Sequence, residues 1–295
     1  SCTSGNSDIR PVTTMAYEAI WDGEAVSDRS NWNNPTNWVG DTLPQTNATA
    51  YFYQSAGLTT TNVDLNGNQV VKALRFRDDA TDDVALRGSA LSIFSGGIGV
   101  GAGAAGDHAI LSEVIVAADQ TWTNASTRDF TIAGTVAGAG AIEKRGEGRI
   151  ILLGNDSTFT GALAINEGAL QIRGTNALGT SAGGTTVADG AALELHGGGN
   201  AVDFAAEPLT ISGAGVAGGG ALRFVQNNVD YKGAIALAGD ARIQAASNSA
   251  VASGAIAIDT NTLAVGVQAE ATELRLGGAL SGTRNADGEY AFVKD

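Results

Sequence analysis

Two pairs of adjacent acidic residues, Asp78-Asp79 and Asp82-Asp83, form the densest group of chemically active side chains in the sequence, just after two arginines. Carboxylates gathered in this way can bind Ca²⁺, or serve as acid and base in enzymes that cleave polysaccharides. The surrounding residues have the character of a turn. We therefore expect a solvated turn here, rather than a calcium site or a catalytic centre.

The sequence also offers two histidines, His108 and His196, and one cysteine, Cys2. Neither the ligand spacing of a zinc site nor a Gly-x-Ser-x-Gly nucleophile elbow occurs. The glycine-rich runs 96–106 and 213–220 lack the Lys-Ser/Thr of a phosphate-binding loop and precede no helix, so they predict tight turns and close packing of neighbouring segments. We expect no catalytic residue, no cofactor and no metal, with His196 exposed at a strand end.

Three of the four tryptophans, Trp21, Trp32 and Trp38, fall close together among several asparagines. Exposed aromatic faces stack on sugar rings, and asparagine side chains bond sugar hydroxyls, so the cluster is a candidate glycan contact. The alternative is that the indoles cover the open end of a repetitive β structure, where apolar core and strand edges would otherwise meet water. We favour the cap.

The first 16 residues are polar and show no period, which predicts a flexible leader. Its single cysteine, Cys2, has no partner for an internal disulfide, so it indicates an intermolecular link, a lipid attachment or a spare thiol. Charge and hydropathy narrow the partners further. A net charge of −14 disfavours nucleic acid and anionic membrane surfaces. No run of 18 apolar residues occurs, so no membrane span is expected.

The elements that would position these residues are short strands. From about residue 58, runs of three to six residues alternate between apolar and polar side chains, with glycine, asparagine or aspartate between the runs. No helical period extends beyond one or two turns, so the class is all-β. We expect the following apolar side chains to point inward: Leu163, Ile165, Leu170, Ile172, Leu193, Leu195, Leu222 and Phe224.

Internal repetition indicates how the strands are arranged. Residues 155–165 match residues 227–237, with an offset of 72 (231 − 159). A second match, of residues 132–144 with residues 276–294, begins at an offset of 144 (276 − 132). A spacing of 72 accommodates three coils of roughly 24 residues, which favours a β-solenoid of about ten coils in which each coil is buried against its neighbours.

Residues 138–179 are the most specific part of the sequence. They contain Gly138-Ala139-Gly140-Ala141-Ile142-Glu143-Lys144, then Leu152-Leu153-Gly154-Asn155, Phe159-Thr160-Gly161, Ile165-Asn166-Glu167-Gly168-Ala169-Leu170 and Ala177-Leu178-Gly179. This order resembles the autotransporter-associated β-strand repeat of bacterial passenger domains. The resemblance covers most of residues 17–295 and implies a right-handed parallel β-helix, export and a place at the cell surface. Two departures are that no membrane barrel follows and that the last repeat stops after Lys294.

These observations give one organisation: a flexible leader (1–16), a Trp-rich N-terminal cap (17–57) and a right-handed parallel β-helix (58–295). We expect a secreted or cell-surface structural or adhesive protein that is not an enzyme. Its finer form is a homo-oligomer or head-to-tail filament joined through Cys2 and the unfinished apolar coil at Ala291, Phe292 and Val293. The alternatives are a surface module that binds a glycan and a β-helix enzyme that degrades polysaccharides.

Overall fold

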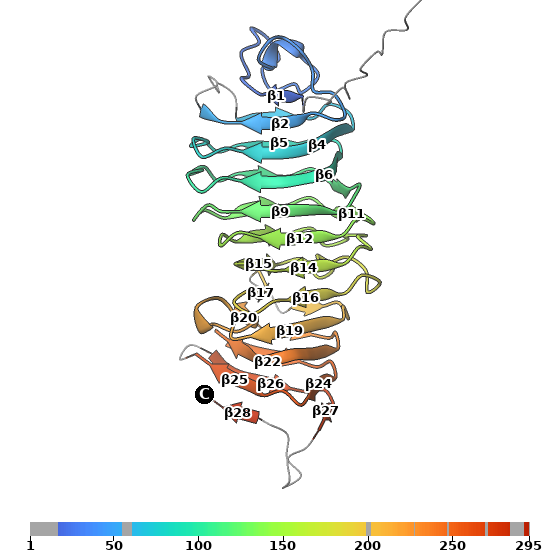
Figure 1. Ribbon diagram of the computed structural model, residues 1–295, viewed down its shortest axis with the longest axis vertical. Coiled ribbons are helices and arrows are strands. Elements are labelled where there is room, and N and C mark those ends of the chain that lie inside the picture. The colour runs from blue at the N-terminus through green and yellow to red at the C-terminus, as the bar shows by residue number, and fades with distance from the viewer. Residues whose placement is uncertain are drawn as a thin grey trace, which may run out of the picture.

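The computed structural model describes residues 17–54, 61–198, 202–226, 228–246, 248–268, 271–283 and 292–294. They form an all-β solenoid of about nine turns, with parallel strands stacked along one long axis (Figure 1). The predicted fold class is confirmed, and the coil number is close to the ten expected. No helix among the described residues is long and apolar enough to cross a membrane.

Most strands belong to one sheet that follows the coils around. Its strands are β1 (Glu18–Ile20), β2 (Thr49–Phe52), β3 (Asn62–Asp64), β4 (Gln69–Phe76), β5 (Ala85–Arg87), β6 (Leu91–Val100), β7 (Ala109–Ile110), β8 (Val114–Val116), β9 (Gln120–Asn124), β10 (Phe130–Ile132), β11 (Val136–Gly138), β12 (Ile142–Arg145), β13 (Ile150–Leu152), β14 (Leu163–Ile165), β15 (Ala169–Ile172), β16 (Thr185–Val187), β17 (Ala192–His196), β19 (Leu209–Gly213), β20 (Leu222–Gln226), β22 (Ile235–Ala245), β24 (Ile256–Asp259), β25 (Leu263–Val267), β27 (Leu280–Gly282) and β28 (Phe292–Lys294).

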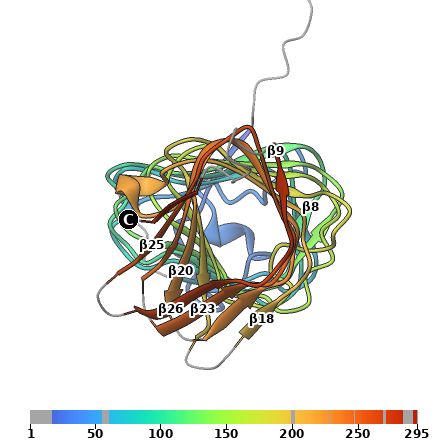
Figure 2. The same cartoon turned by 90° about the horizontal axis from the view of Figure 1, so that it is seen from below.

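A second sheet forms an extra wall in the C-terminal half, seen at one side when the solenoid is viewed along its axis (Figure 2). Its strands are β18 (Val202–Phe204), β21 (Val229–Tyr231), β23 (Asn248–Ala252) and β26 (Ala271–Leu276). Two short 3-10 helices lie outside the sheets, at Pro35–Asn37 and Val216–Gly218.

The strand register explains the internal repeat. Leu163 pairs with Thr185, which pairs with Leu209, which in turn pairs with Ile235. The residues at the two ends of this series are 72 apart (235 − 163), so the repeat corresponds to three coils, as predicted. Individual coils vary from 20 residues (150 − 130) to 29 residues (222 − 193).

The second sequence match is not a structural repeat. The column that begins at Ile142 runs through Ile256 to Leu280, whereas Phe292 pairs with Leu263 in a neighbouring column. The two ends of that match therefore occupy different walls. Short runs of small apolar residues recur in every coil, so a match with an insertion can join strands that are not equivalent.

The core is a stack of side chains contributed once per coil. All eight side chains predicted to point inward are buried. Near the N-terminal end the stack is aromatic: the ring of Phe76 lies 5.4 Å from that of Phe52, 4.5 Å from that of His108 and 5.4 Å from that of Phe130. Because parallel strands repeat at about 4.8 Å, like side chains from successive coils meet in van der Waals contact.

The two glycine-rich runs behave differently. Residues 213–220 form a turn, as predicted, with positive φ angles at four glycines. The first part of the run 96–106, however, lies within β6 rather than in a turn. At Gly97 (φ +64°) an added Cβ would lie 2.1 Å from the carbonyl oxygen of Thr121 in the next coil, so glycine is required there by the close approach of two coils.

Candidate functional site

The tryptophan cluster lies at the N-terminal end, beside β1 and β2. Trp21, Trp32 and Trp38 are all buried, with exposed fractions of 0%, 2% and 1%. The ring of Trp38 makes edge-to-face contacts with Trp21 (5.1 Å) and Trp32 (4.6 Å), and its Nε1 donates to the Trp32 carbonyl at 2.9 Å. Trp21 also packs against Phe52, the first ring of the aromatic stack. The indole faces therefore contact protein, which supports the cap, and none is open to a sugar in this conformation.

The loop that carries these tryptophans is held by buried asparagine contacts. Asn37 is fully buried; its Oδ1 accepts from the amide of Ala25, and its Nδ2 donates to the carbonyls of Asp28 and Asn31. Because β1 and β2 continue the parallel sheet toward β4, the segment predicted as cap also contributes strands to the solenoid. The covering material is the loop between those two strands.

The acidic pairs lie in exposed turns, as predicted. Asp78 accepts a hydrogen bond from the amide of Gly103, and Asp83 accepts one from the amide of Asp107, so each carboxylate ties its turn to the next coil. Among the described residues no group of three potential metal ligands occurs. His196 ends β17 as expected, but it is half-buried rather than exposed, and its Nδ1 accepts from the amide of Gly198.

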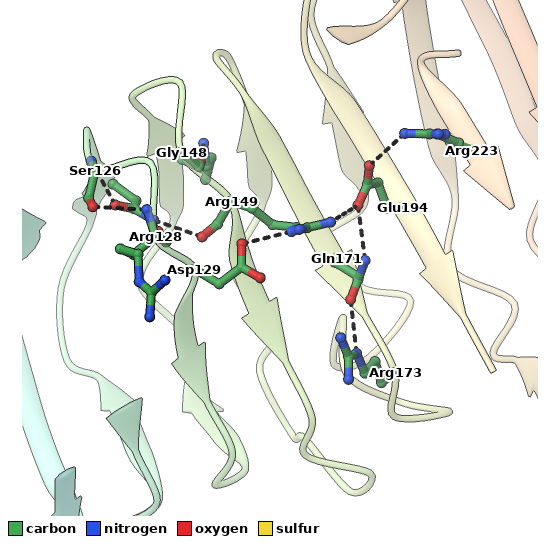
Figure 3. A network of polar contacts seen from close by, with 11 residues as sticks. Ser126, Arg128, Asp129, Gly148, Arg149, Gln171, Arg173, Glu194 and Arg223 are labelled. Atoms are coloured by element: carbon green, nitrogen blue, oxygen red, sulfur yellow. Dashed lines mark hydrogen bonds and ion pairs between the residues drawn. The ribbon is translucent and has the colours of Figure 1, made fainter. Parts of the chain in front are cut away.

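A network of charged side chains crosses several coils on one outer wall (Figure 3). Arg149 donates to Asp129 at 2.9 Å and to Glu194 at 3.1 Å. Glu194 also accepts from Gln171 at 3.0 Å and pairs with Arg223 at 3.4 Å. Although it points outward, Glu194 is only 5% exposed.

This network was not predicted from the sequence. Both of its carboxylates are occupied as acceptors by arginine, an arrangement suited to fastening coils together. We interpret it as a clamp across the wall rather than a pair of carboxylates available for acid and base chemistry.

Lys144 is a second feature that the sequence reading missed. Its side chain is fully buried, and its ammonium donates to the carbonyls of Gly146, Gly148 (2.6 Å) and Glu167 (2.6 Å). Burial lowers the pKa of Lys144 to about 8, while the charge of Glu167 opposes that shift. The ammonium form therefore predominates at neutral pH and joins the turns of two successive coils.

Glu207 is a buried carboxyl with few partners. It is 4% exposed, and its Oε2 accepts no hydrogen bond from the described residues. Burial raises the pKa of Glu207 to about 7, and the neighbouring Thr185 hydroxyl and Gly184 amide offset this only in part. The folded chain thus keeps this proton at pH values where an exposed glutamate has lost it.

Stability should therefore fall as pH rises from about 4.5 to 7, because the unfolded chain releases the Glu207 proton before the folded chain does. We expect Glu207→Gln to remove this dependence and to stabilise the protein at pH 8 by on the order of 3 kcal/mol. Urea unfolding at pH 5 and pH 8 measures both effects. The matched control is Glu113→Gln, at an exposed position. Equal pH dependence in wild type and Glu207→Gln would contradict the prediction.

The largest hollow of the surface runs along the axis on another wall. Two grooves of about 530 Å³ and about 460 Å³ share Thr121 and together cross eight strands, namely β2, β4, β6, β9, β12, β14, β16 and β19. We call this continuous feature the axial trough. Its strands lie one below another along the solenoid (Figure 1).

Two columns of outward-facing residues form the floor of the axial trough. The first column is Tyr51, Arg75, Gly99 and Thr123. The second column is Thr121, Glu143, Ala164, Thr186 and Thr210. The alternation within each strand places these residues outside while their neighbours fill the core, so the floor is a consequence of the same period-two pattern that predicts the strands.

The fold and its axial trough define a parallel β-solenoid with a long exposed binding face. Over 97 residues the chain is 33% identical to the adhesin BmaC autotransporter of Brucella suis biovar 1 (strain 1330). The matched segment covers 33% of this chain but only 3% of that relative. No family model matches the chain, and no solved structure gives a significant match. The similarity supports the expected relation to autotransporter passenger proteins, while membership of the specific repeat family stays a prediction.

Proposed function

We propose that this chain is a non-catalytic, adhesive β-solenoid presented outside the cell, as part of a passenger-like surface protein. The observation that carries the proposal is the parallel solenoid itself, combined with the similarity to an autotransporter adhesin. A solenoid extends by adding coils, so it supplies both length and a continuous surface for contact. Secretion and surface location belong to the proposal.

Adhesion can be measured directly with the 295-residue protein. Beads coated with it should attach to host epithelial cells several-fold more often than beads coated with albumin. Antibodies against the chain should also label intact cells of its natural host. Attachment equal to that of albumin-coated beads would count against an adhesive role.

The absence of enzymatic activity is part of the same proposal. Asp129 and Glu194, the carboxylates of the wall network, are both held by Arg149, and the acidic turns are tied to neighbouring coils. Turnover of a polysaccharide that is lost in Glu194→Gln, with the fold intact, would replace this proposal with the enzyme alternative.

Assembly into a filament is the finer proposal. Cys2 and Ala291 lie outside the described residues; the backbone of Phe292 and Val293 pairs in parallel with Leu263 and Ala264 of β25. If the leader supplies a strand to another copy, electron microscopy should show fibres that disappear when residues 1–16 are removed. Fibres that persist without the leader, or a protein that stays monomeric at high concentration, would argue against this mechanism.

A further inference from the structure

We propose that the axial trough binds an uncharged, extended polysaccharide that lies parallel to the solenoid axis, with about one sugar unit per coil. This inference rests on the proposed adhesive function and names its ligand class. It uses a surface separate from the tryptophan cluster, whose ring faces are covered. The argument has three parts: the length of the trough, the chemistry of its floor and its charge.

The length of the trough fits a polymer rather than a small molecule. The grooves cross eight strands that are paired in parallel register, so they span seven coil-to-coil steps. At about 4.8 Å per step this is roughly 34 Å. One step is close to the length that a single pyranose adds to an extended glycan. A linear polysaccharide would therefore meet the same kind of contact at each coil.

The floor supplies the groups that sugar hydroxyls need. Thr121, Thr123, Thr186 and Thr210 present hydroxyls, which both donate and accept hydrogen bonds. Glu143 adds a carboxylate acceptor near the middle, where its Oε1 already accepts from Arg145 and Asn166. At the N-terminal end Tyr51 offers a half-exposed aromatic ring.

Small residues let a chain lie close to the backbone between these groups. Gly99 and Ala164 occupy floor positions where a larger side chain would block the trough. Ala141, Ala162 and Gly184 line its edge. A ligand can thus run past several coils without crossing a bulky barrier.

Charge indicates an uncharged glycan. The carboxylates in the lining, Asp78, Asp119 and Glu143, face only two arginines there. Arg75 donates to the backbone carbonyls of Leu74, Gly96 and Gly97, and Arg77 lies 4.4 Å from the ring of Tyr53. With a net charge of −14, the chain repels polyanions, and its trough holds no arginine directed at an anionic partner.

The first test is titration calorimetry of the 295-residue protein with three series of linear oligosaccharides, namely cello-, manno- and xylo-oligosaccharides. We expect at least one series to bind, with affinity that rises with chain length up to about seven units, where the trough is filled. Oligogalacturonates of equal length should bind at least 10-fold more weakly. The absence of binding in all three neutral series, or tighter binding of the oligogalacturonates, would overturn the proposal.

The second test locates the site. Thr186→Arg and Thr121→Arg place a long side chain across the floor and should weaken binding at least 10-fold. Thr186→Val, which removes one hydroxyl from an exposed position without adding bulk, should weaken it about 2-fold to 5-fold. The matched control is Thr131→Arg, an outward threonine of β10 on a different wall, which should bind as wild type does.

The outcomes also separate this inference from the proposed function. Coated beads that attach to cells equally well with wild type and Thr186→Arg, without any binding of neutral glycans, would leave adhesion in place and remove the trough as its site. Glycan binding that is equally weakened by Thr131→Arg would likewise exclude the trough. Circular dichroism and thermal unfolding of each variant exclude misfolding as the cause of a loss.

Discussion

Replacing Lys144 by methionine should lower the free energy of unfolding by about 3 kcal/mol, one of the two largest effects that we expect from the structure. Methionine keeps the length and apolar character of the side chain but removes the ammonium. Three backbone carbonyls, of Gly146, Gly148 and Glu167, then lose a buried donor. The loss falls on two successive turns, so the coils should separate locally as well as lose stability.

Urea unfolding followed by fluorescence measures the shift of the midpoint. The matched control is Lys232→Met, because Lys232 is exposed and pairs only with Asp203 at the surface; its effect should stay below about 0.5 kcal/mol. Hydrogen exchange should show faster opening at residues 146–148 and 167 in Lys144→Met. A variant as stable as wild type would mean that water replaces the ammonium without cost.

The second large effect concerns the N-terminal end. Removing residues 17–53 should convert the soluble protein into aggregates, because it takes away the tryptophan cluster and two strands and leaves β4 as an open edge. Phe76, now buried beneath Phe52, would meet water. Light scattering and size-exclusion chromatography measure the outcome. If the shortened protein stays soluble, monomeric and as stable as wild type, the segment is an appendage rather than a cap.

A point substitution separates the tryptophan cluster from the strands. Trp38→Ala removes two edge-to-face ring contacts and one buried hydrogen bond, so it should cost about 3–5 kcal/mol. The neighbouring Val39→Ala alters an exposed side chain and should change stability by less than about 0.5 kcal/mol. Equal effects of the two substitutions would show that the cluster contributes no more than surface residues do.

The sequence carries the fold because a solenoid repeats its own rules. Alternation of apolar and polar residues identifies which side chains fill the core, and the offset of 72 gives the coil length once three strands share it. The same regularity misleads where strands are alike, as in the match that joins residues 132–144 to residues 276–294. Registers in the last coils depend on loop lengths that a pattern of short apolar runs does not specify.

Lys144 shows a signal that was present but unused. It shares the parity of Ile142 within β12, so alternation alone places its side chain inside the solenoid. The wall network had no such signal. Glu194 is outward by parity, and its burial results from Arg149, 45 residues earlier, and Arg223, 29 residues later. Contacts of that range follow from how coils stack, which a single sequence does not reveal.

The axial trough could be predicted only in part. The outward positions of Thr186 and Thr210 follow from alternation around Val187 and Ile211, but their alignment in one column requires the register of the coils. The hollow also depends on small residues at the edge of the wall, such as Ala162 and Gly184. Composition rich in glycine and alanine therefore indicates close stacking without showing where a groove results.

The direction of the hydrogen bonds has a mechanical consequence. Successive coils are joined by parallel strand pairs, so these bonds point along the long axis of the molecule. Tension applied to the two ends would break them one coil at a time, and each event would release 20 to 29 residues, or about 70–100 Å of chain. Under pull from an attached cell, such a tether would lengthen in steps and dissipate work in each step, while the coils still stacked keep their surface intact.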